Sequence, residues 1–250
     1  MVKVSPGDQR RCCVVGISVD VCHDVVAAAI SLRDGGGGQI VTLNAEITMM
    51  ARALPSLRDT IAAAELVIPD GAGVIWALEC QNVRVSRIPG IELAWSLLQY
   101  AATHSWAVAL VGGAPEVRIC LQQRLPKCLP GLQLNLVEHG YQEPQQWLNT
   151  ELRLAQLRPD LVLVALGAPH QELWSHRVRQ GLPGIWMGVG GSFDVWAGVK
   201  RRAPTWIRHC RIEWLYRLLQ EPGRWRRTLS IPVFVWTVLW HRHGSTEKRP

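Results

Sequence analysis

The chain has 250 residues, a mean hydropathy of +0.06 and a formal net charge of +7. Its length suffices for one large α/β domain, or for a domain with an appendage. The low hydropathy excludes a polytopic membrane protein, and the N-terminus shows no apolar segment of a secretory signal. Seven cysteines without a C-x-x-C pair favour reduced thiols, so we expect a cytoplasmic protein without a disulfide framework.

Positive charge is concentrated in the last fifth of the chain. Residues 200–250 carry 12 of the 27 Lys and Arg residues but only three of the 20 Asp and Glu residues, a net charge of +9. The preceding residues therefore have a net charge of −2. Such segregation predicts a polyanionic partner, namely nucleic acid, an anionic membrane surface or a phosphorylated substrate. The alternative is a merely solvated basic helix.

Short apolar runs alternate with helical patterns along most of the chain. Several of these runs are apolar at every position, as in strands that are covered on both faces. This alternation predicts an α/β fold with a Rossmann-like, mostly parallel sheet and helices on both faces. We expect the four glycines of 35–38 to form a flexible loop. The predicted strands span residues 12–20, 39–44, 65–70, 106–113, 132–140, 160–169 and 184–194, and the predicted helices span residues 25–34, 55–64, 90–104, 114–125, 143–157 and 169–180.

The alternation ends near residue 198, so we expect a Rossmann-like domain over residues 1–198 and a basic, helical appendage over residues 199–250. An amphipathic helix is predicted from Ile212 to Leu219. The uncharged apolar run from Thr228 to Trp240 has 13 residues, fewer than the ~20 that a membrane-spanning helix needs. It can lie in a membrane interface, or it can pack on the main domain or a partner subunit. The neighbouring arginines favour the membrane.

Small or polar residues follow most of the predicted strands. In a parallel sheet these positions line one edge and form a single crevice. Glycines there let a ligand approach backbone N–H groups, and a helix that starts just after them binds phosphate. We therefore expect a nucleotide or sugar-nucleotide site. The candidate positions are Thr42, Asn44, Asp70, Gly112, Gly113, Tyr141, Gln171, Gly190 and Asp194.

Asp70 ends an apolar run and is followed directly by Gly71. A turn explains this pair simply, because Asp and Gly are common turn residues. A catalytic carboxylate at the carboxyl end of a buried strand is the alternative. Both interpretations place Asp70 at the predicted crevice.

Three familiar motifs of nucleotide enzymes are absent from the sequence. The chain has no G-x-G-x-x-G of a dinucleotide site and no G-x-x-x-x-G-K-[ST] of a P-loop. It also has no D-x-D triplet, with which metal-dependent sugar transferases commonly hold a cation on the diphosphate. A diphosphate enzyme without that triplet must take its counter-charge from arginines. The C-terminal segment offers Arg217, Arg224, Arg226 and Arg227.

Eight sequence blocks occur in order between Cys12 and Arg227, namely VTLNAE, PDGAGVIWA, RIPGIEL, LVGGAPE, HGYQ, LVALGAPHQELW, GVGGSFDVWAGVKRRAPTW and EWLYRLLQEPGRWRR. Together they resemble the WecG/TagA/CpsF glycosyltransferases. The resemblance implies a Rossmann-like domain with a basic appendage that contacts the membrane. It also implies inverting transfer of an N-acetylmannosamine-type sugar from UDP to GlcNAc-diphospho-undecaprenol in cell-surface polysaccharide synthesis, without a metal or another cofactor.

The resemblance also implies roles for single residues. Asp70 matches the proposed general base, which would take the proton from the acceptor hydroxyl. Arg87 would steady the diphosphate, with a surface ion pair as the alternative, and Gln171 would orient a sugar or phosphate. Thr42 and Asn44 would touch donor or acceptor, and Asn44 alternatively caps the following helix.

Other matching positions surround the predicted nucleotide. Tyr141 and Asp194 lie in blocks expected beside it, and Asp194 alternatively caps a helix. Glu172 is expected to serve the start of its helix. His170 stands where family members often carry lysine, so a charge at this position is expected to depend on pH.

The expected partners are a UDP-N-acetylhexosamine donor, a lipid-diphosphate-sugar acceptor and an anionic membrane surface, at the inner face of the cytoplasmic membrane. Arg217, Arg224 and Arg227 match appendage arginines that would reach the lipid diphosphate, and closure of the appendage would exclude water. A homo-oligomer is left open. The rival interpretations are a nucleotide-sugar-binding module without turnover and a nucleic-acid-binding protein, and the apolar run of 229–240 argues against nucleic acid.

Overall fold

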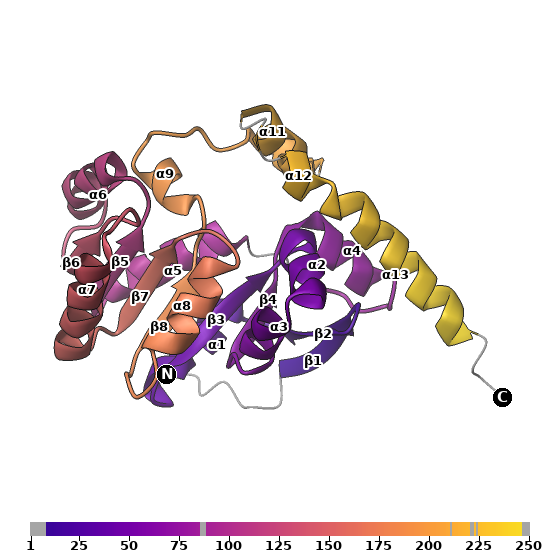
Figure 1. Cartoon of the computed structure of the whole chain (residues 1–250), viewed down its shortest axis with the longest axis horizontal. Helices are drawn as coiled ribbons and strands as arrows, with labels where there is room; N and C mark the ends of the chain where they lie inside the picture. The colour runs from indigo at the N-terminus through magenta and orange to yellow at the C-terminus, as the bar shows by residue number, and fades with distance from the viewer. Residues whose placement is uncertain (1–8, 86–88, 211, 221–222, 224, 247–250) are drawn as a thin grey trace.

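The computed structural model describes residues 9–85, 89–210, 212–220, 223 and 225–246, and it is an α/β fold built on a six-stranded sheet (Figure 1). The strand order is β4-β3-β8-β7-β5-β6, and every neighbouring pair is parallel. The prediction of a mostly parallel sheet is confirmed. The strands are β3 (Gly38–Leu43), β4 (Leu66–Pro69), β5 (Ala107–Gly112), β6 (Gln133–Glu138), β7 (Leu161–Ala165) and β8 (Ile185–Gly188).

Helices connect the strands and cover both faces of the sheet (Figure 1). The six predicted helices are all present, and α2, α4 and α9 are further helices, of which α2 and α9 appear in the sequence analysis only through the capping alternatives for Asn44 and Asp194. These three helices are short and begin almost directly after a strand. Their sequences are therefore too short to show the repeat of apolar residues that identifies a helix. The helices are α1 (Val25–Asp34), α2 (Ala45–Ala53), α3 (Pro55–Ala62), α4 (Gly71–Glu79), α5 (Gly90–Thr103), α6 (Pro115–Cys128), α7 (Pro144–Leu157), α8 (His170–Val178) and α9 (Ser192–Trp196).

The central strands are apolar at every position because both of their faces are buried. In β7, Leu161 and Leu163 belong to a core cluster that includes side chains of α1, α5 and α6. The alternate residues Val162 and Val164 belong to a second cluster, with Leu154 of α7. Successive strand side chains point to opposite faces, so a continuous apolar run fills two cores at once.

The predicted strand over residues 12–20 is wrong. Two antiparallel strands, β1 (Gln9–Val14) and β2 (Ile17–Cys22), form a separate hairpin there. Val15 and Gly16 both have positive φ, 52° and 85°, as the two central residues of a tight hairpin turn do. Valine rarely adopts such a conformation, so the sequence carried no turn signal at this point.

The hairpin lies against the β4 edge of the main sheet and accepts a hydrogen bond from one backbone N–H group of that strand. The buried carboxylate of Asp20 on β2 accepts a hydrogen bond of 2.8 Å from the Val67 backbone N–H on β4. The same carboxylate pairs with Arg11 on β1 at 2.8 Å. A buried charge is stable only when it is paired and hydrogen-bonded, and these contacts meet that requirement.

The glycines of 35–37 connect α1 to β3, as expected of a helix-to-strand loop, and Gly38 begins β3, while the flexibility of the loop stays a prediction. A Cβ built on Gly37 would lie 2.5 Å from the Gly184 carbonyl oxygen, and Gly37 has a φ of +103°. The Gly38 N–H donates to the same carbonyl oxygen at 3.0 Å. Glycine is therefore required here for close backbone approach.

The C-terminal segment forms α10 (Thr205–His209), α11 (Glu213–Gln220), α12 (Trp225–Thr228) and α13 (Ser230–Thr246), which confirms the predicted helix near residues 212–219. Phe234 and Val238 of α13 are buried in one cluster with side chains of α2 and α4. Trp236 and Trp240, on another face of α13, are exposed and stack with ring centroids 6.5 Å apart. The apolar run therefore packs on the main domain with one face and exposes another. The proposed boundary at residue 198 stays a prediction.

No helix within the described part of the chain is long and apolar enough to cross a membrane.

Candidate active site

The carboxyl ends of the six parallel strands lie at one edge of the sheet, and the predicted site residues follow these ends. Thr42 lies near the end of β3, Asp70 follows β4, Gly112 ends β5 and Gly190 follows β8. Neighbouring strands are about 4.8 Å apart, so β4 and β5, four steps apart in the sheet, are separated by roughly 19 Å. The edge can therefore hold a long ligand with several parts.

One group of predicted residues gathers where β3 and β4 end. A Cβ built on Gly71 would lie 3.5 Å from the Asn44 Cβ. A Cβ built on Gly90 would lie 2.9 Å from the Thr42 Cγ2, so the start of α5 rests directly on this threonine. The structure thus brings Thr42, Asn44 and the Asp70-Gly71 turn together.

Asp70 is half-buried and caps the N-terminus of α4. Its Oδ1 accepts a hydrogen bond of 2.8 Å from the Gly71 N–H, and its own N–H donates to the Leu43 carbonyl oxygen at 2.8 Å. Gly71 has a φ of +75°, which favours glycine. The Asp-Gly pair therefore does form a turn, and this turn holds the carboxylate at the carboxyl edge. The role of Asp70 as a general base stays a prediction.

Asn44 caps α2, since its Oδ1 accepts a hydrogen bond of 2.9 Å from the Ile47 N–H. The Asn44 carbonyl oxygen also accepts from the Thr48 hydroxyl at 2.8 Å. Thr42 is buried in the strand beside it. The capping alternative for Asn44 is thus what its side chain does in the structure, and contact of Thr42 and Asn44 with donor or acceptor stays a prediction.

Gln171 is buried at the start of α8 and is linked to the turn that follows β8. Its Oε1 accepts a hydrogen bond of 3.1 Å from the Gly190 N–H, and its Nε2 donates to the Glu172 Oε1 at 2.8 Å. A Cβ built on Gly188 would lie 2.6 Å from the Gln171 Nε2, so the amide fits closely against glycine backbone. Gln171 and Gly190 therefore form one unit of the edge.

A second group, made of glycine backbone, lies where β5, β6 and β7 end. A Cβ built on Gly112 would lie 2.4 Å from the Ala165 carbonyl oxygen, and the Gly113 N–H donates to that oxygen at 3.0 Å. The Gly140 N–H donates to the Gly113 carbonyl oxygen at 2.8 Å, which places the loop after β6 beside Gly113. Tyr141 follows in this loop with 76% of its surface exposed. Its exposed ring is available for a ligand.

Asp194 is the third residue of α9, which Gly191 caps, so the capping alternative for Asp194 is wrong. Its carboxylate instead pairs with the Lys200 ammonium at 2.6 Å. The Asp194 carbonyl oxygen accepts from the Val199 and Lys200 N–H groups at 2.9 and 3.0 Å. Asp194 therefore anchors the beginning of the C-terminal segment to α9. Contact with a nucleotide stays a prediction.

The C-terminal segment is tied to the main domain by ion pairs at the starts of two helices. Arg227 lies 3.6 Å from Glu46 in the first turn of α2. Arg202 and Arg208 both pair with Glu92 in the first turn of α5, at 2.5 and 3.2 Å. The sequence did not single out these last two arginines. Among the other predicted arginines, Arg87 and Arg224 lie outside the described residues, as do the side chains of Arg217 and Arg226.

Glu172 lies in the first turn of α8 as expected, but its side chain points into the protein and is 2% exposed. Burial raises the pKa of this carboxyl above its ordinary value; a hydrogen bond from Gln171 opposes the rise, and the charge of Glu46 adds to it. The spacing of Gln171, Glu172 and Ser175, all buried, marks the inner face of α8. A polar stripe of this kind normally marks the outer face of a helix, so the sequence carried no signal that it lies inside.

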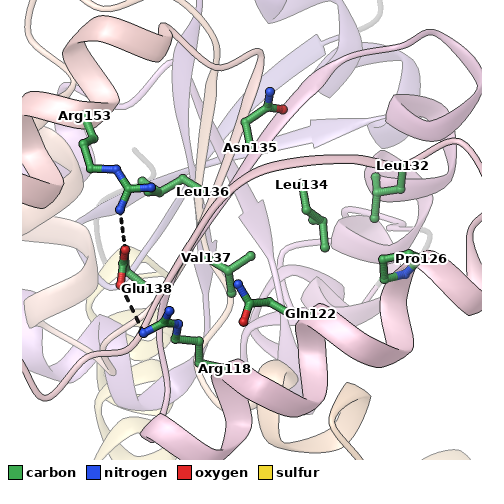
Figure 2. Close-up of a pocket in the computed structure, with 10 residues that line it drawn as sticks. All are labelled: Arg118, Gln122, Pro126, Leu132, Leu134, Asn135, Leu136, Val137, Glu138 and Arg153. Atoms are coloured by element: carbon green, nitrogen blue, oxygen red, sulfur yellow. Dashed lines mark hydrogen bonds and ion pairs between the residues drawn. The ribbon is translucent and has the colours of Figure 1, made fainter.

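Two hollows in the described surface lie away from the predicted residues. One, of about 440 Å³, lies between α6 and the edge strand β6, where Glu138 bridges Arg118 and Arg153 at 3.7 and 2.6 Å (Figure 2). The other, of about 370 Å³, is an apolar groove between α11, α12 and α13.

Among the described residues, no group of three or more His, Cys, Asp or Glu side chains is arranged to hold a metal ion. All seven cysteines lie in the described part of the chain and are free. Metal independence stays a prediction.

The carboxyl edge of the parallel sheet carries a carboxylate that caps a helix, several glycine turns and a closely fitted amide. Proteins of the α/β class bind their ligands at this edge. The model of the glycosyl transferase WecG/TagA/CpsF family matches residues 12–248. The chain belongs to this family, as its sequence blocks predicted, and it is a glycosyltransferase.

Two relatives carry the name N-acetylglucosaminyldiphosphoundecaprenol N-acetyl-beta-D-mannosaminyltransferase. The protein of Bacillus spizizenii is 37% identical over 218 residues, which cover 86% of this chain and 84% of that protein. The protein of Bacillus subtilis is 35% identical over 205 residues, covering 81% of this chain and 79% of that protein.

Proposed function

We propose that the chain transfers N-acetylmannosamine from a UDP-linked donor to GlcNAc-diphosphoundecaprenol, with inversion and without a metal, on the cytoplasmic face of the membrane. The observation that carries the proposal is 37% identity, over 84% of its length, to a relative named for this transfer. The group of Thr42, Asn44 and Asp70 at the carboxyl edge supports it, because this is where α/β sheets hold their ligands.

In the proposed reaction, Asp70 takes the proton of the acceptor hydroxyl as its oxygen attacks the anomeric carbon of the donor. The bond from that carbon to the diphosphate oxygen breaks, and UDP leaves with the electron pair. A single displacement from the opposite face inverts the anomeric centre. The fixed backbone contacts of Asp70 with Gly71 and Leu43 support this role, because a general base must be held within hydrogen-bond reach of its proton.

The departing diphosphate needs positive charge or N–H donors in the absence of a cation. We propose that the glycine turns at Gly112, Gly113 and Gly190, with Tyr141 and Asp194 beside them, bind the donor. The hydrogen bond from the Gly190 N–H to the Gln171 Oε1 supports this role of the Gly190 turn because it holds the turn in place, so that the glycine backbone beside it is fixed for the approach of the diphosphate. The guanidinium group of Arg87 supplies counter-charge there, and those of Arg217, Arg224 and Arg227 bind the diphosphate of the lipid-linked acceptor.

We propose that residues 199–250 hold the lipid-linked acceptor at an anionic membrane surface. Support comes from the exposed apolar residues that the four C-terminal helices carry next to the arginines. The exposed fraction of each of these residues lies between 38% and 73%. They are Trp206, Trp214, Leu215, Leu219, Trp225, Leu229, Val233, Trp236, Leu239 and Trp240.

The proposal is tested by UDP release from UDP-ManNAc with a GlcNAc-diphospho-lipid acceptor in EDTA. Wild type is compared with Asp70→Asn, and Asp59→Asn on the exposed side of α3 is the matched control. We expect acceptor-dependent release that survives EDTA, falls about 10²- to 10⁴-fold in Asp70→Asn and persists in the control. Binding of the donor without release, across a panel of UDP-sugars and acceptors, would replace the transferase by a binding module.

A further inference from the structure

The buried face of α8 carries an acid that the proposed reaction does not use. Glu172 is 2% exposed, and its neighbours on this face, Gln171 and Ser175, are also buried. Glutamate is almost never fully buried without a partner, because removing a charge from water is costly. Such a residue must therefore be explained by its contacts.

Glu172 is the first member of a hydrogen-bond chain that ends at the candidate site. Its Oε1 accepts from the Gln171 Nε2 at 2.8 Å, and the Gln171 Oε1 accepts from the Gly190 N–H at 3.1 Å. The carboxyl group thereby fixes which way the Gln171 amide faces. With the amide in this orientation, its oxygen faces the loop after β8 and accepts the hydrogen bond from the Gly190 N–H.

The second carboxyl oxygen, Oε2, has no hydrogen-bond partner among the described residues. Two other buried oxygens of the same layer, the Gln39 Oε1 and the Ser175 Oγ, also have none there. Gln39 is held close by its Nε2, which donates to the Glu172 carbonyl oxygen at 2.9 Å, and Ser175 follows one turn along α8. Of these groups, the Gln39 Oε1 can only accept a hydrogen bond, and a carboxylic acid at Glu172 brings a donor for it, whereas the Ser175 hydroxyl both donates and accepts and so does not distinguish the two forms of Glu172.

Charges around Glu172 also favour the neutral form. Burial raises the pKa of Glu172 most and the negative charge of Glu46 on α2 adds to the rise, while hydrogen bonds from the Gln171 amide and from the Glu172 backbone oppose it, and the net direction is upward. The strands β3, β7 and β8, which pack on α8, contribute no charged residue. The remaining charged or titratable groups of α3 and α8 and the nearby ion pairs are Arg58 with Asp59, Arg177 with Glu151, Arg179 with Glu65, and the histidines His170 and His176.

We propose that Glu172 is a positioning residue that acts as a neutral carboxylic acid, orienting Gln171 and through it the Gly190 turn for the donor diphosphate. The donor part of this inference rests on the proposed function. The protonation state and the hydrogen-bond chain rest on the contacts of Glu172 alone.

Steady-state kinetics of Glu172→Gln and Glu172→Ala test the positioning role. A glutamine can accept from Gln171 and donate to the buried oxygens as a carboxylic acid does, so we expect Glu172→Gln to keep the donor KM within about twofold. The alanine variant leaves the Gln171 amide without its partner, and we expect its donor KM to rise about tenfold or more. Asp59→Asn, on the exposed side of α3, is the control for the donor KM, and Glu116→Gln, which removes an exposed acid from the first turn of α6, is the control for thermal unfolding.

The pH dependence of thermal unfolding tests the protonation state without any activity. An acid with a raised pKa in the fold stabilises fully below its unfolded pKa, near the ordinary 4.5, and loses this contribution as pH rises through its folded pKa. Wild type should therefore lose stability relative to Glu172→Gln as pH rises above about 4.5, and Glu116→Gln should track wild type.

A Glu172→Gln variant that loses transfer as completely as Glu172→Ala would overturn the proposal, and so would a constant stability difference between wild type and Glu172→Gln at all pH values. An unchanged donor KM in Glu172→Ala would also overturn it. If no variant, including wild type, transfers sugar, the proposed function fails, while the melting curves still decide the state of Glu172.

Discussion

Around β3 and β4 the carboxyl edge of the sheet carries polar side chains, whereas around β5, β6 and β7 it is mostly glycine backbone. Thr42, Asn44 and Asp70 form the first half, in which two side chains cap helices. Gly112 and Gly113 in the second half lie directly on the Ala165 carbonyl. Side chains can transfer protons, and bare backbone can approach a phosphate closely. We propose that the polar half activates the acceptor and that the glycine half binds the donor.

Substitution in the glycine half is expected to have the largest structural effect. In Gly112→Ala the new Cβ would lie 2.4 Å from the Ala165 carbonyl oxygen at a φ of +123°. We expect the free energy of unfolding to fall by more than the ~1–2 kcal/mol that a left-handed alanine costs by itself. Donor affinity should fall with it. Chemical denaturation and calorimetry measure the two effects.

Gly181→Ala is the control for the glycine half. Gly181 follows α8, has a φ of +75° and has open space where a Cβ would lie. It should therefore show the conformational cost alone and bind the donor as wild type does. Equal losses of stability in both variants would mean that close packing at Gly112 does not matter.

The next effect concerns the acceptor. Arg227→Ala removes a partly exposed pair with Glu46, so the free energy of unfolding should change by only about 0–1 kcal/mol. If Arg227 binds the lipid diphosphate, the KM for the lipid-linked acceptor should rise about tenfold, and the donor KM should not change. Arg58→Ala on α3 serves as the control. A rise in the donor KM instead would move Arg227 to the donor half.

The smallest effect separates capping from function in the polar half. Asn44 caps α2 and Asp24 caps α1 through the same kind of side-chain contact, at 2.9 Å in both. Each change to alanine should cost about 1 kcal/mol of stability. Only Asn44→Ala should also reduce transfer. If both variants keep full activity in a transfer assay, Asn44 is a cap and nothing more.

The sequence predicted the parallel sheet because strands buried on both faces are apolar throughout, as in β7. It did not predict the hairpin of β1 and β2, since a valine with positive φ at residue 15 gives no turn signal. It also missed α4, although its cap, Asp70, was singled out as a site residue, and it reached α2 only through the capping alternative for Asn44. A short helix with its cap at a strand end looks like a binding residue in a loop.

The candidate site shows the same limit. Strand-end positions of Thr42, Asp70 and Gly112 follow from the parallel arrangement, because all carboxyl ends share one edge. The inward orientation of Glu172 does not, since acids in a first helical turn usually remain in solvent. The pairing of Asp194 with Lys200 depends on where the chain leaves α9, which no local pattern encodes.

The most direct test of the division between the halves is the affinity of Asp70→Asn for UDP-ManNAc, measured by calorimetry beside its rate of transfer. The account predicts a Kd equal to that of wild type with transfer reduced about 10²- to 10⁴-fold, because Asp70 acts on the acceptor proton. A Kd that weakens as much as the rate falls would contradict it, and would make Asp70 part of the donor site.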